Sequence, residues 1–326
     1  MVTETDYIGK VELNSGLPSQ AIGRSASSTY YVTEDTPIET LFEMFNNSEM
    51  DVPAVGIVDE HMVGMGAIVR KDLISLLSRP FGREVLKKRP VKKVKKDAKS
   101  FITTQHIFAV SDEIQENERL VKDDFYLLHN EDGKFMGLFS TRDLLIYLSN
   151  LTQKDITLAH NLQKRMVKER LSLLTAELEV AASATTAKGV GGDFYSLKKV
   201  SNKDWITSLC DVSGKGVAAS IITSMLYGIL ETFDYRRGLV DLVRQLNRSI
   251  FSTFHAEKYL TGIFCHFDET TSKLNILDMG HSYIMLIRNK KIHKIQTSTQ
   301  NLPVGITDEV EPQASSLTME RNDILI

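Results

Sequence analysis

The sequence predicts an α+β protein whose two parts are joined by a helix. In the C-terminal part, strands are followed by two long helices at 217–233 and 239–254, and then by antiparallel strands. This order is typical of an α+β sandwich rather than a parallel doubly wound sheet. In the N-terminal part, the order helix–strand–strand–helix occurs twice. The expected segments are a flexible N-terminus at 1–29, the repeated part at 30–150, a helical linker at 151–175 and the sandwich at 176–326.

Length, composition and charge limit the classes of protein to which this chain can belong. The chain has 326 residues, 42% of them hydrophobic, which is ordinary for one to three globular domains. A net charge of −3 and a pI near 6.3 argue against a general nucleic-acid binder. No apolar run approaches the ~20 residues that span a bilayer, and the acidic N-terminus does not resemble a signal peptide. We therefore expect a cytoplasmic protein without nucleic-acid or membrane partners. Cys210 and Cys265 are expected to be buried thiols.

The first copy of the repeat begins near Tyr31. Thr36 as N-cap and Pro37 at the first helical position predict a helix start. Strands at 52–59 and 62–69 and a helix at 70–78 follow. The second copy has a helix at 111–121, strands at 125–129 and 134–139 around a hairpin turn, and a helix at 142–149. Asp72 and Asp143 occupy equivalent places, 71 residues apart.

This repeat, with a glycine before each final helix, resembles a tandem CBS (cystathionine β-synthase-type) pair. In that family a Gly-x-x-Ser/Thr-x-x-Asp motif often holds a nucleotide ribose. The second copy has it from Gly137 to Asp143, so the resemblance implies an adenine nucleotide at Ser140 and Asp143. The first copy has Val69 where the hydroxyl is expected. Ser-x-x-Asp is also an ordinary helix start, and many such pairs simply dimerise.

Two further stretches have more than one interpretation. Between the copies, cations crowd the stretch 83–96, and such runs are usually solvated surface. A patch that attracts phosphate or acids is the alternative; no interleaved aromatics indicate single-stranded nucleic acid. In the linker, Leu158, Leu162, Met166 and Leu173 fit one helical stripe. The linker can transmit a change of register or form a short coiled coil, and we expect a homodimer.

The stretch 189–223 contains the candidate metal-binding residues. Asp193 and Asp211 each lie beside glycines on strands that the reversal at 201–204 would pair. Aspartate is depleted in strands, and a single one usually caps or turns the chain. Two brought together indicate a shared divalent cation such as Mg²⁺ or Mn²⁺. The Ser213–Gly216 run lacks the spacing of a P-loop, so an NTPase is not expected.

At 191–195 (GGDFY) and 211–216 (DVSGKG), the sequence resembles the signature pair of the SpoIIE/RsbU branch of the PPM metal-dependent serine/threonine phosphatases. The similarity continues at 261–264, 278–281 and 303–305. It implies an α/β/β/α sandwich with Asp193 and Asp211 as catalytic metal ligands and the Val212 carbonyl completing a two-metal site. Mn²⁺ or Mg²⁺ there would clamp the phosphate and lower the pKa of a bound water.

Three departures from the family pattern matter. Ser196 stands where the family often has aspartate, and Asp278 begins a motif that is usually Asn-Ala-Gly-His. The chain also ends at Ile326, before the motifs that supply the family's later aspartates, so we expect a sandwich incomplete at its C-terminus. His281 is expected to be structural.

The resemblance implies a phosphoserine or phosphothreonine protein as substrate, such as an anti-sigma-factor antagonist, with the CBS-like part as a gate. The alternative is a non-catalytic, ligand-sensing interaction module built on a metal-deficient phosphatase fold.

Overall fold

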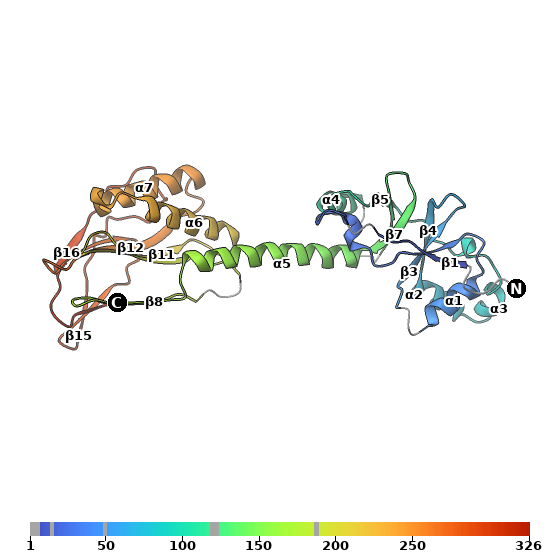
Figure 1. Cartoon of the computed structure of the whole chain (residues 1–326), viewed down its shortest axis with the longest axis horizontal. Helices are drawn as coiled ribbons and strands as arrows, with labels where there is room; N and C mark the ends of the chain where they lie inside the picture. Colours follow the sequence, from blue (N-terminus) through green and yellow to red (C-terminus); the bar gives the residue numbers. More distant parts are fainter. Residues whose placement is uncertain (1–6, 14–15, 48–50, 118–123, 186–188) are drawn as a thin grey trace. The chain divides into compact units, whose positions relative to one another are not determined.

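The structure is a computed structural model that describes residues 7–13, 16–47, 51–117, 124–185 and 189–326. The chain divides into two compact units, residues 1–152 and 153–326, which are coloured from blue to green and from green to red in Figure 1. Helix α5 (Thr141–Met166) belongs partly to each unit. Each unit is described by itself.

Both copies of the repeat in unit 1 have the same order of elements. The first consists of β2 (Tyr30–Thr33), α1 (Ile38–Asn46), β3 (Ala54–Val58), β4 (Gly64–Val69) and α2 (Arg70–Leu77). The second consists of β5 (Ser100–Ile102), α4 (Ile107–Asn117), β6 (Phe125–His129), β7 (Phe135–Ser140) and α5. In each copy the first strand pairs parallel with the second, which pairs antiparallel with the third. The short β1 (Ile8–Lys10) adds to the first sheet through β2.

Two backbone irregularities also repeat, which supports the internal repeat read from the sequence. The register shifts at Ile57/Val58 in the first copy and at Leu128/His129 in the second. Gly66 and Gly137 have φ of +143° and +152°. A Cβ at Gly66 would lie 2.5 Å from the Lys96 carbonyl oxygen, so only glycine fits the close approach of the chains there.

A basic stretch packs against the first copy. It contains α3 (Gly82–Leu86) and the 3₁₀ turn η3 (Val91–Lys93), and Val91 is fully buried in the core of that copy. Its ion pairs are Arg83–Glu39 (3.0 Å), Lys87–Glu39 (3.9 Å), Lys92–Asp35 (2.6 Å), Lys95–Glu34 (3.0 Å) and Lys96–Asp72 (2.7 Å). These cations therefore fasten the stretch to unit 1 and are more than solvated surface.

The start of α1 differs from the sequence-based expectation. Pro37 is the N-cap, without a side-chain cap, and the Thr36 hydroxyl contacts that of Thr33 instead. The first N–H groups of α1 are satisfied by the basic stretch, because Ile38 and Glu39 donate to the carbonyls of Arg89 and Lys87, each at 2.9 Å. The prediction of a Thr36 cap is wrong because distant carbonyls take its role.

Helix α5 runs without a break from unit 1 into unit 2. The sequence analysis separated a helix at 142–149 from a linker, yet no Gly or Pro interrupts 141–166, and the helix continues. After it, β8 (Arg170–Leu174) and β9 (Glu179–Ser183) form a hairpin. Leu173 therefore lies in a strand and not on the helical stripe. The alternating burial of β8 is typical of a half-exposed strand.

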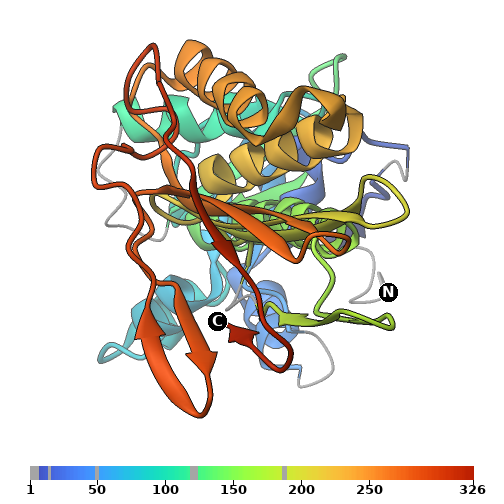
Figure 2. The same ribbon diagram turned by 90° about the vertical axis from the view of Figure 1, so that its left-hand side faces the viewer.

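Unit 2 is built in layers. Its main sheet has the order β10-β11-β12-β13-β16, and all its neighbours are antiparallel. These strands are β10 (Asp193–Lys199), β11 (Asp204–Val212), β12 (Leu260–Asp268), β13 (Lys273–Met279) and β16 (Ser315–Thr318). Figure 2 shows α6 (Val217–Thr232) and α7 (Gly238–Phe254) on one side of this sheet. A core that includes Phe194, Leu226 and Leu246 fills the space between them.

The other face of the main sheet is covered by a second, smaller sheet. It consists of β14 (Met285–Arg288), β15 (Lys291–Lys294) and β17 (Ile324–Leu325) in the order β15-β14-β17. A separate core that includes Ile263, Ile276 and Ile284 lies on this face. Helices on one face and a second sheet on the other confirm the predicted α+β class.

Two burial expectations can be compared with the structure. Cys210 and Cys265 are buried, and burial raises the pKa of both thiols, that of Cys265 to about 12. Among the described residues, no single helix is long and apolar enough to cross a membrane. The bent pair of α6 with 235–254, meeting at 88°, reaches that threshold together.

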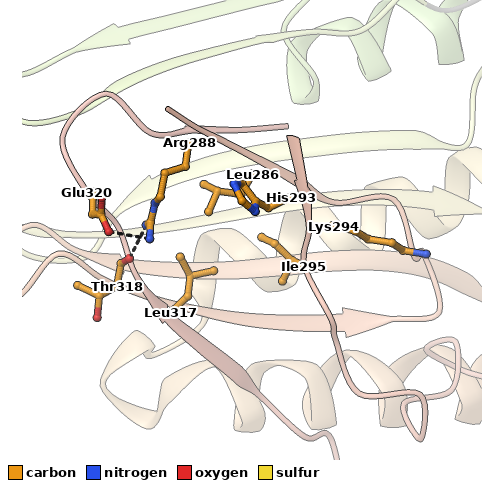
Figure 3. A pocket seen from close by; sticks show the side chains of 8 residues that line it. All are labelled: Leu286, Arg288, His293, Lys294, Ile295, Leu317, Thr318 and Glu320. Carbon is orange, nitrogen blue, oxygen red and sulfur yellow. Dashed lines mark hydrogen bonds and ion pairs between the residues drawn. The ribbon is translucent and has the colours of Figure 1, made fainter. Parts of the chain in front are cut away.

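A buried ion pair fastens the end of the described chain. Arg288 on β14 donates to Asp323 from Nε (3.0 Å) and from Nη2 (2.6 Å), and the Asp323 side chain is only 2% exposed. Figure 3 shows the same guanidinium reaching Glu320 and the Thr318 carbonyl, beside a cavity of about 500 Å³. The hydrogen bonds from Arg288 hold the pKa of Asp323 below its usual range.

Asp323→Asn is expected to lower the thermal midpoint at pH 7, because it removes a bidentate charged pair. A carboxylate with a lowered folded pKa stabilises the fold above its unfolded pKa of ~3.9, and this stability is lost as the pH falls through the folded value. The difference in thermal midpoint between wild type and variant should therefore shrink as the pH falls below ~3.9, as thermal unfolding between pH 7 and 3 would measure. Asp308→Asn, at an exposed aspartate, is the control. A midpoint difference that persists unchanged into acid would contradict the assignment.

Candidate metal centre

The two sequence-predicted aspartates are brought together. Asp193 begins β10, and its partner in the antiparallel register is Asp211 near the end of β11. Residues directly opposite one another point to the same face, with Cβ atoms roughly 5 Å apart. Thr261 on β12 is the next partner of Asp211, so Asp193, Asp211 and Thr261 form a row across three strands. Both aspartates are exposed.

A second aspartate pair in the same sheet shows what is unusual about the first. Asp204 and Asp268 are also cross-strand partners, at the opposite end of β11. Asp204 accepts from Ser201 Oγ and contacts His266 Nε2 at 3.2 Å, while Asp268 accepts from the Thr270 amide and the Thr271 hydroxyl. Within the described part of the chain, neither carboxylate of Asp193 and Asp211 has a hydrogen bond or an ion pair. Like charges directly opposite are unfavourable, so this pair calls for a cation.

The Val212 carbonyl is held beside the pair by a close backbone approach. A Cβ at Gly192 would lie 3.0 Å from the Val212 oxygen and 3.3 Å from the Gly214 oxygen. The Val212 amide donates to the Gly192 carbonyl at 3.3 Å. Any side chain at position 192 would therefore push the backbone before Asp193 and the carbonyls of Val212 and Gly214 apart. This explains a glycine there without any requirement for an unusual φ.

The loop after Val212 is fastened to the segment before β12. The Ser213 amide donates to the Tyr259 carbonyl at 2.8 Å, and the Tyr259 amide donates to Ser213 Oγ at 3.1 Å. The half-buried Lys258 donates from Nζ to the Ser213 carbonyl at 3.3 Å. Gly214 and Gly216 are left-handed, with φ of +85° and +83°, which lets the loop turn sharply before α6.

The donors present suit an oxygen-preferring cation. Two carboxylates and one backbone carbonyl are hard ligands of the kind that Mg²⁺ and Mn²⁺ select. They supply about half of an octahedral shell. No group of three or more His, Cys, Asp or Glu side chains able to hold a metal occurs among the residues that the structure describes. The predicted site residues Asp193, Asp211 and Val212 thus fit a metal in part.

Gln163 supports the backbone of the candidate site, and the sequence analysis did not predict this role. It lies on α5 with 5% exposure, and its amide pairs with the backbone of Gly191, donating to the carbonyl (2.6 Å) and accepting from the N–H (2.9 Å). The same amide nitrogen donates to the hydroxyl of the buried Thr223 on α6 at 3.0 Å. Gln163 therefore connects α5 and α6 to the strand entry two residues before Asp193. A polar residue among other polar residues of a linker helix gave no signal in the sequence.

His281 and Asp278 have structural contacts. The Asp278 carboxylate, 3% exposed, accepts from the amides of His281 and Ser282 and from the Thr297 hydroxyl, and so fixes this loop. The His281 ring lies 3.2 Å from Thr261 Oγ1, next to the row of aspartates. This arrangement agrees with the expected structural role of the histidine.

The predicted nucleotide residues in unit 1 satisfy one another. Ser140 donates to Asp143 from its amide (2.8 Å) and its hydroxyl (2.7 Å), and the Asp143 amide donates back to Ser140 Oγ. Together they cap α5, with Ser140 only 4% exposed. A cavity of about 200 Å³ lies instead beside Asp72, the equivalent residue of the first copy, and Lys96 and Lys99 also line it.

Comparison with known proteins finds a similarity in the C-terminal part of the chain. Residues 201–326 match the family "Stage II sporulation protein E (SpoIIE)". Stage II sporulation protein E of Priestia megaterium is 27% identical over 148 residues, which are 44% of this chain and 25% of that protein. The chain therefore spans about a quarter of this curated relative.

Solved structures show weaker similarity, on which no argument rests. The PP2C phosphatase domain of SpoIIE from Bacillus subtilis, with a fragment of its regulatory domain, has 23% identity and a TM-score of 0.38, covering 42% of this chain and 39% of that one. The CBS domain of the bacterial CNNM/CorC family Mg²⁺ transporter has 15% identity and a TM-score of 0.32, covering 40% of this chain and 76% of that one. Residues 201–326 thus resemble the SpoIIE family, and Asp211 of the Asp193–Asp211 pair lies within the matched residues.

Proposed function

We propose that this chain is a metal-dependent protein serine/threonine phosphatase of a signalling system. The observation that carries the proposal is the register pair Asp193–Asp211, whose carboxylates lack partners among the described residues, while the Asp204–Asp268 pair of the same sheet has them. The SpoIIE-type domain supports the same reaction class. A substrate phosphate can reach the pair because both aspartates are exposed.

Asp193, Asp211 and the Val212 carbonyl would hold Mn²⁺ or Mg²⁺. Such ions neutralise phosphate charge and lower the pKa of bound water, the chemistry that phosphate hydrolysis needs. The chain's own groups prepare the site. Gly192 lets the Val212 carbonyl approach, and Lys258 and Tyr259 hold the Ser213 loop in place. The proposed substrate is a phosphoserine or phosphothreonine in a regulatory partner protein, such as an anti-sigma-factor antagonist.

Gating by unit 1 is proposed through α5. The helix starts at the Ser140–Asp143 cap in unit 1 and carries Gln163, which holds the Gly191 backbone beside Asp193. A shift or rotation of α5 would move this support. An adenine nucleotide is the proposed ligand of unit 1. The cavity beside Asp72, with Lys96 and Lys99, offers it more room than the mutually bonded Ser140 and Asp143 do.

A non-catalytic interaction module is the second candidate. One observation favours it: no third carboxylate, histidine or cysteine joins Asp193 and Asp211 among the residues described. A partly built site could bind a cation or a phosphorylated partner without turning it over. The two candidates differ in one measurable property, namely Mn²⁺-dependent hydrolysis.

Asp211→Asn is expected to abolish Mn²⁺-dependent hydrolysis of p-nitrophenyl phosphate, by more than about 100-fold. Without metal, the variant should be at least as stable as wild type, because the like-charge pair is removed. With Mn²⁺ at 100 times its dissociation constant, wild type should gain about 2.7 kcal/mol of unfolding free energy and the variant little. Enzyme assays and thermal unfolding with and without Mn²⁺ measure both effects.

Asp204→Asn is the matched control, since it changes one aspartate of the satisfied pair in the same sheet. It should retain both activity and the Mn²⁺-induced stabilisation. Stabilisation by Mn²⁺ without hydrolysis in the wild type would select the non-catalytic candidate. If Mn²⁺ neither stabilises nor activates the folded wild type, the metal site itself is ruled out.

Gln163→Leu is expected to weaken Mn²⁺ binding about tenfold, because the support behind Gly191 is lost. The unpaired Gly191 backbone groups should also cost about 1–3 kcal/mol of stability. Electron paramagnetic resonance of free Mn²⁺ during titration measures the affinity. Gln153→Leu, at an exposed position of the same helix, is the control. Equal Mn²⁺ affinity of both variants would show that Gln163 is only a packing residue.

The proposed homodimer uses the exposed apolar residues of α5. Leu158 and Leu162 are 61% and 46% exposed, and their spacing of four residues puts them on one face of the helix. Light scattering at micromolar concentration should give the mass of a dimer, and Leu158→Lys with Leu162→Lys should give that of a monomer. A monomeric wild type would exclude this interface.

A further inference from the structure

Two large apolar side chains protrude from unit 1 at α3. Phe81 is 77% exposed and Val85 is 61% exposed. Phe81 precedes the first residue of α3, and Val85 lies in the single turn of this helix, so both side chains belong to one short segment. The segment itself is well anchored, because Leu86, Val91 and Val94 pack into the core of the first copy. Phe81 and Val85 therefore remain outside on a segment whose other face is buried.

The backbone that presents Phe81 is tightly built. Phe81 has φ of +61°, a left-handed conformation that bulky residues rarely adopt. The Gly82 amide donates to the Arg79 carbonyl at 2.8 Å, and the Val85 amide donates to the Phe81 carbonyl at 3.1 Å. A Cβ at Gly82 would lie 2.6 Å from the Leu76 carbonyl. An unfavourable backbone at an exposed aromatic residue points to a role outside the fold.

Cations without partners flank these two side chains. Whereas Arg83 and Lys87 pair with Glu39, the exposed Arg79, Lys88 and Arg89 have no ion pair within the described part of the chain. Lys88 and Arg89 lie in the exposed turn that follows α3, within four residues of Val85, and the exposed Glu84 is the one acidic residue of the stretch 79–89. We name these five residues the α3 tip: Arg79, Phe81, Val85, Lys88 and Arg89. In Figure 1, α3 lies at the end of unit 1 away from the start of α5.

We propose that the α3 tip docks unit 1 onto an anionic lipid surface. Phe81 and Val85 enter the headgroup region, and Arg79, Lys88 and Arg89 bind the lipid phosphates and carboxylates. A nucleic acid would use the cations but has no place for the aliphatic Val85. The sequence-based expectation of no membrane partner came from the lack of a spanning segment, which surface docking does not need. The inference is independent of the phosphatase proposal.

The test is co-sedimentation of the full chain with vesicles of phosphatidylcholine, with and without phosphatidylserine. Wild type should bind only the vesicles that contain phosphatidylserine, and less at high salt. Phe81→Gly removes the ring and suits the left-handed backbone, so the fold should be kept while binding falls about tenfold. Lys88→Gln with Arg89→Gln should weaken binding about fivefold for each charge.

Matched controls exist elsewhere in the chain. Phe108 on α4 is 46% exposed, but it stacks on His106, and Asp112 follows one turn later. Phe108→Ala and the surface pair Lys291→Gln with Lys294→Gln should leave binding unchanged. The proposal is overturned if wild type ignores phosphatidylserine, or if Phe81→Gly and Phe108→Ala bind equally. It is also overturned if Phe81→Gly dissolves a dimer seen by light scattering, since a second copy would then cover the tip.

Discussion

The register between β10 and β11 is the constraint on which the candidate site depends. It puts Asp193 opposite Asp211 and leaves their carboxylates on the face away from α6 and α7, while Phe194 and Cys210 point into the core with those helices. Since side chains alternate along a strand, a slip by one residue would turn one carboxylate into that core. The packed apolar partners therefore fix the position of the charges, and the repulsion between the charges is tolerated because the core does not allow the strands to slip.

Around this pair, the supporting contacts come from backbone groups held by distant side chains. Gly191 is held by Gln163 from α5, Gly192 by its approach to the Val212 carbonyl, and Ser213 by the segment that leads into β12. The backbone at Gly191, Gly192 and Ser213 thus positions the candidate site. Contacts from α5, from the end of β11 and from the segment before β12 hold this backbone in place. Each segment is connected separately to the core of unit 2, which explains how exposed carboxylates can be held in place.

The sequence predicted the parts of the structure that depend on local pattern. The repeat in unit 1, the helices α6 and α7, and the pairing of Asp193 with Asp211 follow from periodicity, turn residues and motif spacing. What it missed depends on contacts between distant residues. Gln163 looks like any polar linker residue until it meets Gly191, and Thr36 lost its predicted cap to carbonyls about fifty residues away. The sequence analysis divided α5 into two segments because its apolar residues pack in two different cores. Its first turns pack in unit 1 and its last turns in unit 2.

The continuity of α5 also constrains how such a chain can change over evolutionary time. Gln163 is 22 residues after the first residue of the helix at Thr141, and each residue turns the helix by about 100°. One inserted or deleted residue between the units would alter the phase between the two ends by that angle. Insertions of seven residues nearly restore the phase, and insertions of eighteen residues, five full turns, restore it fully. If α5 couples the two units as proposed, N-terminal units could be exchanged on this helix only at lengths that preserve its helical phase.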